Sequence, residues 1–172
     1  NIQWVEGDYY RKLAKERTVK DFTIPANKGN VYSADGSLLA TSIPEYTVYS
    51  DAVAPTPELF KENVQGLSDS LSVMFGKSSG HYQAKLQKAR ANKSRYVFIA
   101  KKLSYTEHMR LKTFPLFNKG ANKGGLIIEQ KIVREHPIGL VAKRTIGYER
   151  SNEDGKGLEY AFRDYLNGKN GH

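Results

Sequence analysis

The hydrophobic positions of this 172-residue chain change period several times along its length. Alternating or continuous apolar runs predict short strands, and apolar residues spaced three to four apart predict helices. The predicted strands are residues 28–32, 38–40, 46–50, a run within 92–101 and 126–134. The predicted helices are residues 1–17, 57–75, about 80–91 and 104–113, with a last one from Gly157. Because strands and helices mix without a regular strand–helix–strand repeat, we expect an α+β fold.

Turn and cap residues fix several boundaries. Asp35-Gly36 predicts a tight turn between two strands, because both residues tolerate positive φ. Pro44 is expected to interrupt the second of these strands. Thr56, Pro57 and Glu58 have the order of a helix N-cap, first position and first turn. Ser79 or Gly80 is expected to cap the next helix, and the polar, glycine-rich residues 118–125 to form a turn.

The stretch 134–168 has the pattern of a joint between structural parts. His136-Pro137 should end a strand, because proline can neither donate to a sheet ladder nor continue a helix. A short helix is expected within 138–148, followed by a surface loop at 149–156. Gly157 then opens a segment whose apolar residues recur at helical spacing, and Gly168 stands where a left-handed C-terminal cap belongs. Those apolar residues are Leu158, Phe162, Tyr165 and Leu166.

The order of these elements predicts two lobes within one domain. Residues 46–123 contain their own apolar helix stripe and strand, and they form an inserted head lobe. Residues 1–45 and 124–172 flank the insertion and pair into an anchor lobe of short strands and helices. The whole is expected to be one elongated, two-lobe domain spanning 1–172.

Composition excludes several classes of protein. The longest apolar runs are strand-sized, well short of the roughly 18 residues that a membrane-spanning helix needs. The absence of cysteine excludes disulfides, thiolate metal sites and a cysteine nucleophile. The first residue is not Met and the N-terminal residues have no signal-peptide pattern, so we expect the N-terminus to be cut from a longer protein.

The formal net charge of +9 favours an anionic partner. Nucleic acid, anionic lipid head groups and polyanionic wall polymers all fit that charge. The basic residues lie in separate clusters mixed with apolar positions, which also suits the solvated faces of helices. A basic nucleic-acid-binding module therefore stays open as an alternative function.

No catalytic or metal-binding pattern is present. The four histidines have no metal-ligand spacing, and neither a P-loop nor a G-x-S-x-G sequence occurs. The S-x-x-K sequence of a serine acyltransferase is also missing from the chain. We therefore expect a protein without an enzymatic site, a metal or a cofactor.

Three sequence blocks together resemble the N-terminal, non-catalytic domain of class B penicillin-binding proteins. The first, 28–40, has Lys28-Gly29 and Asp35-Gly36 where the family has Arg-Gly and Asn-Gly. The second is Arg134-Glu135-His136-Pro137-Ile138-Gly139, similar to Arg-x-Tyr-Pro followed by Gly. The third, 154–168, is similar to Gly-x-x-Gly-Leu-Glu followed by Leu-x-Gly. The resemblance covers nearly the whole chain.

This resemblance implies a pedestal that positions a transpeptidase domain at the periplasmic face of the bacterial inner membrane. The implied partners are that transpeptidase domain, a SEDS-type polymerase, other division proteins and a second copy in a homodimer. Nucleic acid is not among them, and the membrane is reached only through a helix preceding this segment. The compact inserted lobe favours the septal, cell-division branch over the elongation branch.

The resemblance also singles out residues for structural or interaction roles. We expect Lys28, Arg134 and Glu159 to form a charged clamp, with the carboxylate between two cations, that fixes the angle of the joint. Three independent solvated charges are the alternative. The complete set of motif residues is Lys28, Gly29, Asp35, Gly36, Arg134, Pro137, Gly139, Gly157, Glu159 and Gly168.

Overall fold

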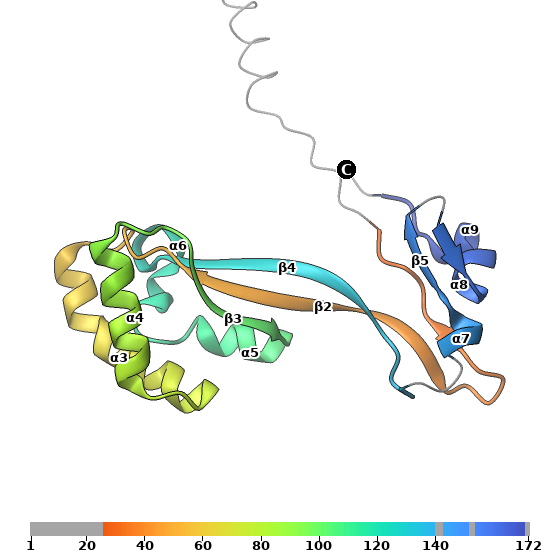
Figure 1. The fold of residues 1–172 in the computed structure, drawn as a ribbon, viewed down its shortest axis with the longest axis horizontal. Coiled ribbons are helices and arrows are strands. Elements are labelled where there is room, and N and C mark those ends of the chain that lie inside the picture. The colour runs from red at the N-terminus through yellow and green to blue at the C-terminus, as the bar shows by residue number, and fades with distance from the viewer. Residues whose placement is uncertain (1–25, 140–142, 152–153, 171–172) are drawn as a thin grey trace, which may run out of the picture. The chain divides into compact units, whose positions relative to one another are not determined.

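The computed structural model describes residues 26–139, 143–151 and 154–170 (Figure 1). The helix predicted at 1–17 lies outside these residues. The chain divides into two compact units, one made of the described parts of Asn1–Ser42 and Glu135–His172, the other of Ile43–Arg134. We call them unit 1 and unit 2. Unit 2 contains the segment 46–123 that we expected as an inserted lobe, together with most of the strand that follows it.

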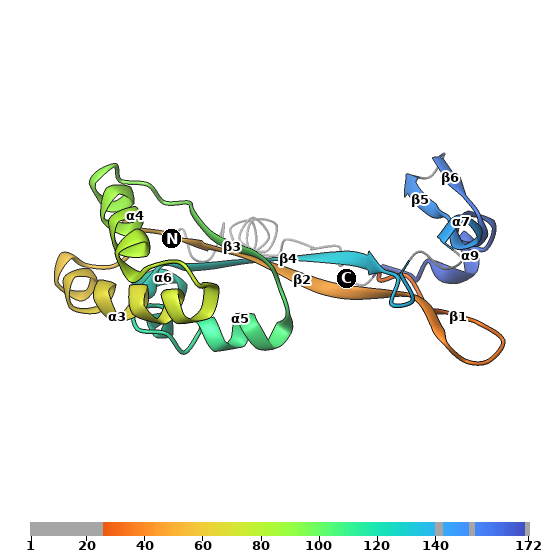
Figure 2. The same ribbon diagram turned by 60° about the horizontal axis from the view of Figure 1, so that its bottom comes forward.

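Unit 2 combines helices with an antiparallel sheet, which confirms the α+β class. Its helices are α3 (Pro57–Phe75), α4 (Ser79–Ala91), α5 (Tyr105–Leu111), the 3-10 turn η1 (Phe117–Lys119) and α6 (Gly120–Gly124). Its strands are β3 (Val97–Leu103) and parts of β2 (Leu38–Ser50) and β4 (Leu126–Glu135). β2 pairs antiparallel with β3 and also with β4, and Figure 2 shows these three strands side by side.

Strand β2 is longer than the sequence predicted, because it continues through Pro44. It pairs with β1 (Val31–Tyr32) at Leu38 and Ala40, and with β3 from Tyr46 to Ser50. The exposed Pro44 lies between these two sets of paired residues. A proline without an N–H is tolerated where no ladder bond is required of it. The prediction that Pro44 interrupts the strand is therefore wrong.

The predicted helix boundaries of unit 2 are largely confirmed. The Thr56 hydroxyl accepts a hydrogen bond from the Leu59 N–H, so Thr56 is the N-cap of α3, and Gly76 ends that helix in a left-handed conformation. The N-cap of α4 is Ser78, one residue before the predicted Ser79, and the helix therefore begins at Ser79. Ser104 and Glu107 form a reciprocal capping box at the start of α5.

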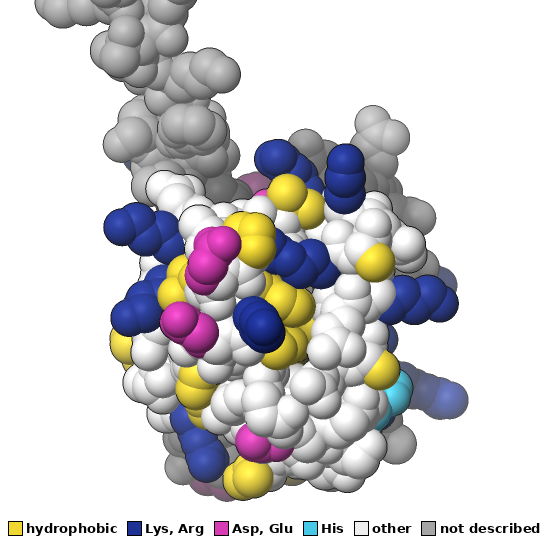
Figure 3. All heavy atoms as spheres, turned by 90° about the vertical axis from the view of Figure 1, so that its left-hand side faces the viewer, with side chains coloured by type: hydrophobic (Ala, Val, Ile, Leu, Met, Phe, Trp, Pro, Cys, Tyr) yellow, Lys and Arg dark blue, Asp and Glu magenta, His cyan; other side chains and the backbone are white. Residues whose placement is uncertain are grey.

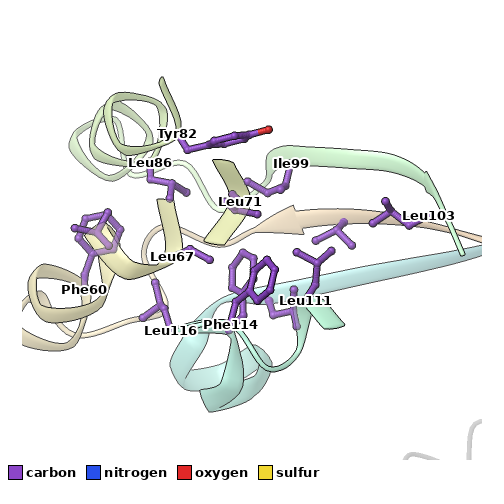
Figure 4. Packing of buried hydrophobic residues seen from close by; sticks show 14 of the residues in the cluster. Phe60, Leu67, Leu71, Tyr82, Leu86, Ile99, Leu103, Leu111, Phe114 and Leu116 are labelled. Atoms are coloured by element: carbon purple, nitrogen blue, oxygen red, sulfur yellow. The ribbon is translucent and has the colours of Figure 1, made fainter. Parts of the chain in front are cut away.

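One hydrophobic core joins these elements. The stripe of α3 points into it, and so do alternate residues of β2 and β3 and the bend at 114–117 (Figure 4). The fully buried side chains at its centre are Val48, Leu67, Leu71, Leu86, Leu111, Leu116 and Phe117. Burying this set gives unit 2 a core of its own.

The bend at 114–117, which closes this core, contains a tight turn. The Phe117 N–H donates to the Pro115 carbonyl at 2.9 Å, and Leu116 between them has φ 70° and ψ −54°. This is a γ-turn, a strained conformation for leucine, held in place by burial of its side chain. The polar turn predicted at 118–125 is instead made of the end of η1 and the short helix α6, which is followed by Gly125. Gly124 permits this packing, because a Cβ there would lie 2.1 Å from the Leu116 carbonyl oxygen.

Unit 1 contains short elements around a glycine-rich centre. They are β1, the start of β2, α7 (Lys143–Ile146), β5 (Tyr148–Ser151), β6 (Asp154–Lys156), α8 (Leu158–Ala161) and α9 (Arg163–Leu166). β5 and β6 pair antiparallel, so the surface loop predicted at 149–156 is a hairpin. The segment after Gly157 is two short helices separated at Phe162, where a single helix was expected.

Candidate interaction sites in the two units

The first motif block forms a hairpin, as its Asp-Gly turn predicted. The Gly36 N–H donates to the Ser33 carbonyl at 3.0 Å, and Gly36 has φ 83°. The Asp35 carboxylate accepts hydrogen bonds from the Ser33 hydroxyl and from the Ser37 N–H. These bonds hold the pKa of Asp35 below its usual value, the Ser33 hydroxyl contributing most. Asp35 and Gly36 therefore shape a turn, and the geometry gives them no further chemistry.

The N-terminal end of this block lies against the C-terminal end of the described chain. The Gly29 N–H donates to the Leu166 carbonyl at 2.9 Å, and the Ala26 N–H donates to Asn170 Oδ1 at the same distance. The Lys28 carbonyl accepts a hydrogen bond from the Ser42 hydroxyl at 3.0 Å. The first and third blocks are thus joined within unit 1, although 138 residue numbers separate Lys28 from Leu166.

Gly168 takes part in this junction, but not in the way predicted. The residue that follows α9 is Asn167, in an extended conformation, and Gly168 is not among the glycines with positive φ. The expected left-handed cap at Gly168 is therefore wrong. A Cβ at Gly168 would lie 2.9 Å from the Ala26 Cβ, so close approach of two segments is what favours glycine here.

The second block ends strand β4 and starts a turn, as predicted. The Gly139 N–H donates to the His136 carbonyl at 2.9 Å, with Pro137 at the second position of this four-residue turn. Gly139 has φ 66° and open space around it, so its backbone conformation alone favours glycine. Arg134 is half-buried near the end of β4.

Three glycines hold the hairpin and the helices of unit 1 together. Gly157 has φ 77°, and a Cβ there would lie 2.5 Å from the Thr145 carbonyl oxygen. Gly147 has φ 71°, and its Cβ would lie 1.7 Å from the Lys156 carbonyl oxygen. Gly155 packs against the ring of Tyr160. Gly157 was predicted from its motif, whereas the sequence pattern gave no signal for the role of Gly147.

Glu159 is the buried polar residue of this block. It lies in the first turn of α8 with 3% of its surface exposed. The apolar residues predicted to line the helix face are more exposed, with Phe162 at 51% and Tyr165 at 88%. A carboxylate buried to this degree requires hydrogen bonds or a counter-charge. The pairing of Glu159 with Lys28 and Arg134 stays a prediction.

The positive charge of the chain is concentrated in unit 2. Residues 43–134 contain 15 Lys and Arg and 7 Asp and Glu, a net +8 of the total +9. Figure 3 views the molecule from the side of α3 and α4, where Lys and Arg surround the face and few acidic side chains lie among them. Unit 2 is therefore the part of the chain suited to an anionic partner.

The described residues provide neither a metal site nor a membrane span. Among 26–139, 143–151 and 154–170, no three His, Asp or Glu side chains are grouped to hold a metal ion. Over the same residues, none of the helices combines the length and the apolar character needed to cross a membrane.

Comparisons with known proteins agree with the resemblance of the three blocks. The family model of the penicillin-binding protein dimerisation domain matches residues 23–172. Two curated relatives, each described as a probable peptidoglycan D,D-transpeptidase PenA, come from Neisseria meningitidis serogroups A and B. Each is 25% identical over 174 residues, covering 99% of this chain and 27% of the relative. This chain thus spans about a quarter of the length of those relatives.

Among solved structures, penicillin-binding protein 2X of Streptococcus thermophilus has a similar fold. It superposes with a TM-score of 0.64 at 22% identity, over 87% of this chain and 24% of that one. At this identity the likeness concerns the fold alone. With the family model matching nearly the whole chain, the chain belongs to the penicillin-binding protein dimerisation domain family, the N-terminal, non-catalytic domain of class B penicillin-binding proteins.

Proposed function

We propose that this chain is the pedestal and interaction domain of a peptidoglycan D,D-transpeptidase in cell-wall synthesis. It positions a catalytic domain and binds partner proteins, without performing chemistry itself. The single observation that carries this proposal is the family match over residues 23–172. The Neisseria meningitidis relatives, described as probable peptidoglycan D,D-transpeptidases, supply the reaction class proposed for the whole protein.

The missing catalytic sequence supports a role in binding. Acyl transfer by these enzymes needs a serine activated by the lysine of an S-x-x-K sequence, and none of the chain's serines has that context. The two units differ in net charge, and we assign them different roles. Unit 1 provides a base that is packed closely around glycines, and unit 2 provides a basic surface for partners.

The location, the partners and the cellular role are part of this proposal, because the family resemblance implies them. The domain works at the periplasmic face of the inner membrane, where the full-length protein is anchored by a helix preceding this segment. Its partners are its own transpeptidase domain, a SEDS-type polymerase, other division proteins and a second copy in a homodimer. The septal, cell-division role is preferred to elongation.

The proposal is tested in a full-length class B penicillin-binding protein that carries this domain. Replacing residues 43–134 by the matching segment of a distant family member keeps the fold and changes the partner surface. We expect the chimera to bind fluorescent penicillin normally and yet to fail to restore growth when the native protein is depleted. Full rescue by the chimera would contradict a partner-binding role of this segment.

The nucleic-acid alternative predicts a different result. A protein that neutralises phosphates with Lys and Arg binds DNA with an affinity that falls steeply with salt. A gel shift of this chain with duplex DNA, measured over a range of salt concentrations, separates the two functions. We expect the DNA to show no shift at physiological ionic strength.

A further inference from the structure

The outward face of the sheet in unit 2 carries an exposed group of aromatic rings. In β3, Val97 and Ile99 are buried, and Phe98 between them is 42% exposed. Tyr96, which directly precedes β3, is 51% exposed. The neighbouring strand β2 adds Tyr49, which is half-buried. We call Tyr49, Tyr96 and Phe98 the aromatic cluster. The sequence pattern indicated only a buried strand at this place.

The three rings are held in a fixed arrangement. The Tyr49 and Tyr96 rings stack with centroids 4.0 Å apart, and Phe98 packs edge-on against Tyr49 at 6.0 Å. The Tyr96 hydroxyl donates a hydrogen bond to Glu129, on β4, which raises the pKa of Tyr96. The rings are therefore ordered before any partner arrives, which lowers the entropy lost on binding.

A cation lies over this cluster. Lys85 Nζ, on α4, is 5.5 Å from the centroid of the Phe98 ring. Burial of the Lys85 ammonium, with Lys77 as a second cause, lowers its pKa. The carboxylate of Glu129 lies beside the rings, where it accepts the hydrogen bond of the Tyr96 hydroxyl. The cluster thus combines apolar faces with a positive charge in the unit that carries a net +8.

We propose that the aromatic cluster is the docking surface for an acidic partner protein, which places an apolar side chain on the rings and a carboxylate beside Lys85. This inference rests on the proposed function, since it names a partner surface of the pedestal. Aromatic side chains dominate the binding energy at the centre of protein interfaces. Charge complementarity selects an acidic partner and steers its approach.

Charge also argues against a second copy on this surface. Two copies meeting through the aromatic cluster would bring two units of net +8 together. Like charges placed face to face oppose association unless counter-ions or acidic residues separate them. A homodimer, if it forms, uses another surface.

The test is photo-crosslinking in cells that depend on the full-length protein. A benzophenone amino acid replaces Tyr96 in one strain and Tyr105 in a control strain. Tyr105 is also an exposed tyrosine of unit 2, with 59% of its surface accessible. We expect a protein adduct from position 96, with little from position 105, to a partner whose extracytoplasmic part has a net negative charge. The Tyr96 photoprobe combined with Lys85→Glu should lower the yield of this adduct about tenfold.

Lys61→Glu is the matched charge control, because Lys61 is exposed on α3 and the substitution changes the charge of unit 2 equally. The adduct yield should stay within about twofold of its original value in this variant, since general steering depends only weakly on one distant charge. An equal fall in both variants would overturn a local role of Lys85.

An adduct to a second copy, an adduct removed by muramidase, or equal adducts at positions 96 and 105 would each overturn the docking surface. So would the absence of an adduct in a strain that grows normally, and that result would leave the proposed function standing.

Discussion

At the scale of single residues, Glu159 separates two accounts of unit 1. Its side chain is almost fully buried although it occupies a helix turn whose apolar neighbours face solvent. The resemblance of the third block singled out this residue. The helical spacing of the apolar residues would instead have placed Leu158 and Phe162 in the core. Burial of a carboxylate is costly without compensation, so its partners decide whether the residue stabilises the domain or weakens it.

The first prediction concerns these partners. Glu159→Gln keeps the shape of the side chain and removes its charge, and Arg134→Met removes the cation of the predicted clamp. Each substitution is expected to lower the free energy of unfolding by about 1–3 kcal/mol, because it leaves a partly buried charge without its counter-charge. In urea unfolding, the double mutant should lose much less than the sum of the two. Small, additive losses would show that the charges are independent.

The second prediction concerns Gly157. Gly157 has φ 77° and ψ −161°, a backbone conformation that is essentially restricted to glycine and costs an L-residue about 1–3 kcal/mol, and a Cβ at this position would also collide with the Thr145 carbonyl oxygen. Gly157→Ala should therefore destabilise unit 1 by more than about 2 kcal/mol. Gly36→Ala is the control, since Gly36 has a similar φ with nothing within 4 Å of its Cβ. Equal losses in urea unfolding for the two variants would contradict the close packing around Gly157.

At the scale of elements, the strongest sequence signals were the local ones. The boundaries of α3 follow from Thr56, Pro57 and Gly76, whose effects act within a few residues. The same holds for the cap of α5 and for the turn at Asp35-Gly36. Elements that depend on distant partners were predicted less well. The hairpin β5–β6 lacks an alternating apolar pattern, and glycine contacts with the neighbouring helices are what hold it.

The contact between α5 and β2 leads to a third prediction, on pH. His108 is 4% exposed and stacks on Tyr46 at 4.0 Å, and burial, followed by the nearby Lys112 charge, lowers its pKa. The unfolded histidine binds more protons than the folded one between the two pKa values, so stability falls as pH drops below about 6.5. His108→Phe keeps a ring at this position and cannot titrate.

Urea midpoints measured at about pH 7.5, 6.5 and 5.5 check this prediction. The original protein should lose stability over this range, and His108→Phe should lose clearly less. His81→Gln is the control, because His81 is exposed and its replacement should leave the pH dependence intact. An unchanged slope in His108→Phe would contradict the account of this contact.

At the scale of the whole molecule, the fourth prediction is that the two units open separately. Unit 2 has a continuous core, whereas the described part of unit 1 is held by short helices, a hairpin and a junction of distant segments. Hydrogen exchange should therefore be slowest in α3, β3 and α4 and faster in β5, β6, α8 and α9. Uniform protection across both units would count against separate stabilities.

The central proposal is that this chain acts by binding and not by chemistry, and fluorescent penicillin tests it most directly. The purified chain is incubated with the reagent beside a full-length class B penicillin-binding protein as the positive control. We predict no covalent label on this chain, because it lacks the S-x-x-K serine that penicillin acylates. A stoichiometric label that disappears when one serine is replaced by alanine would contradict the account.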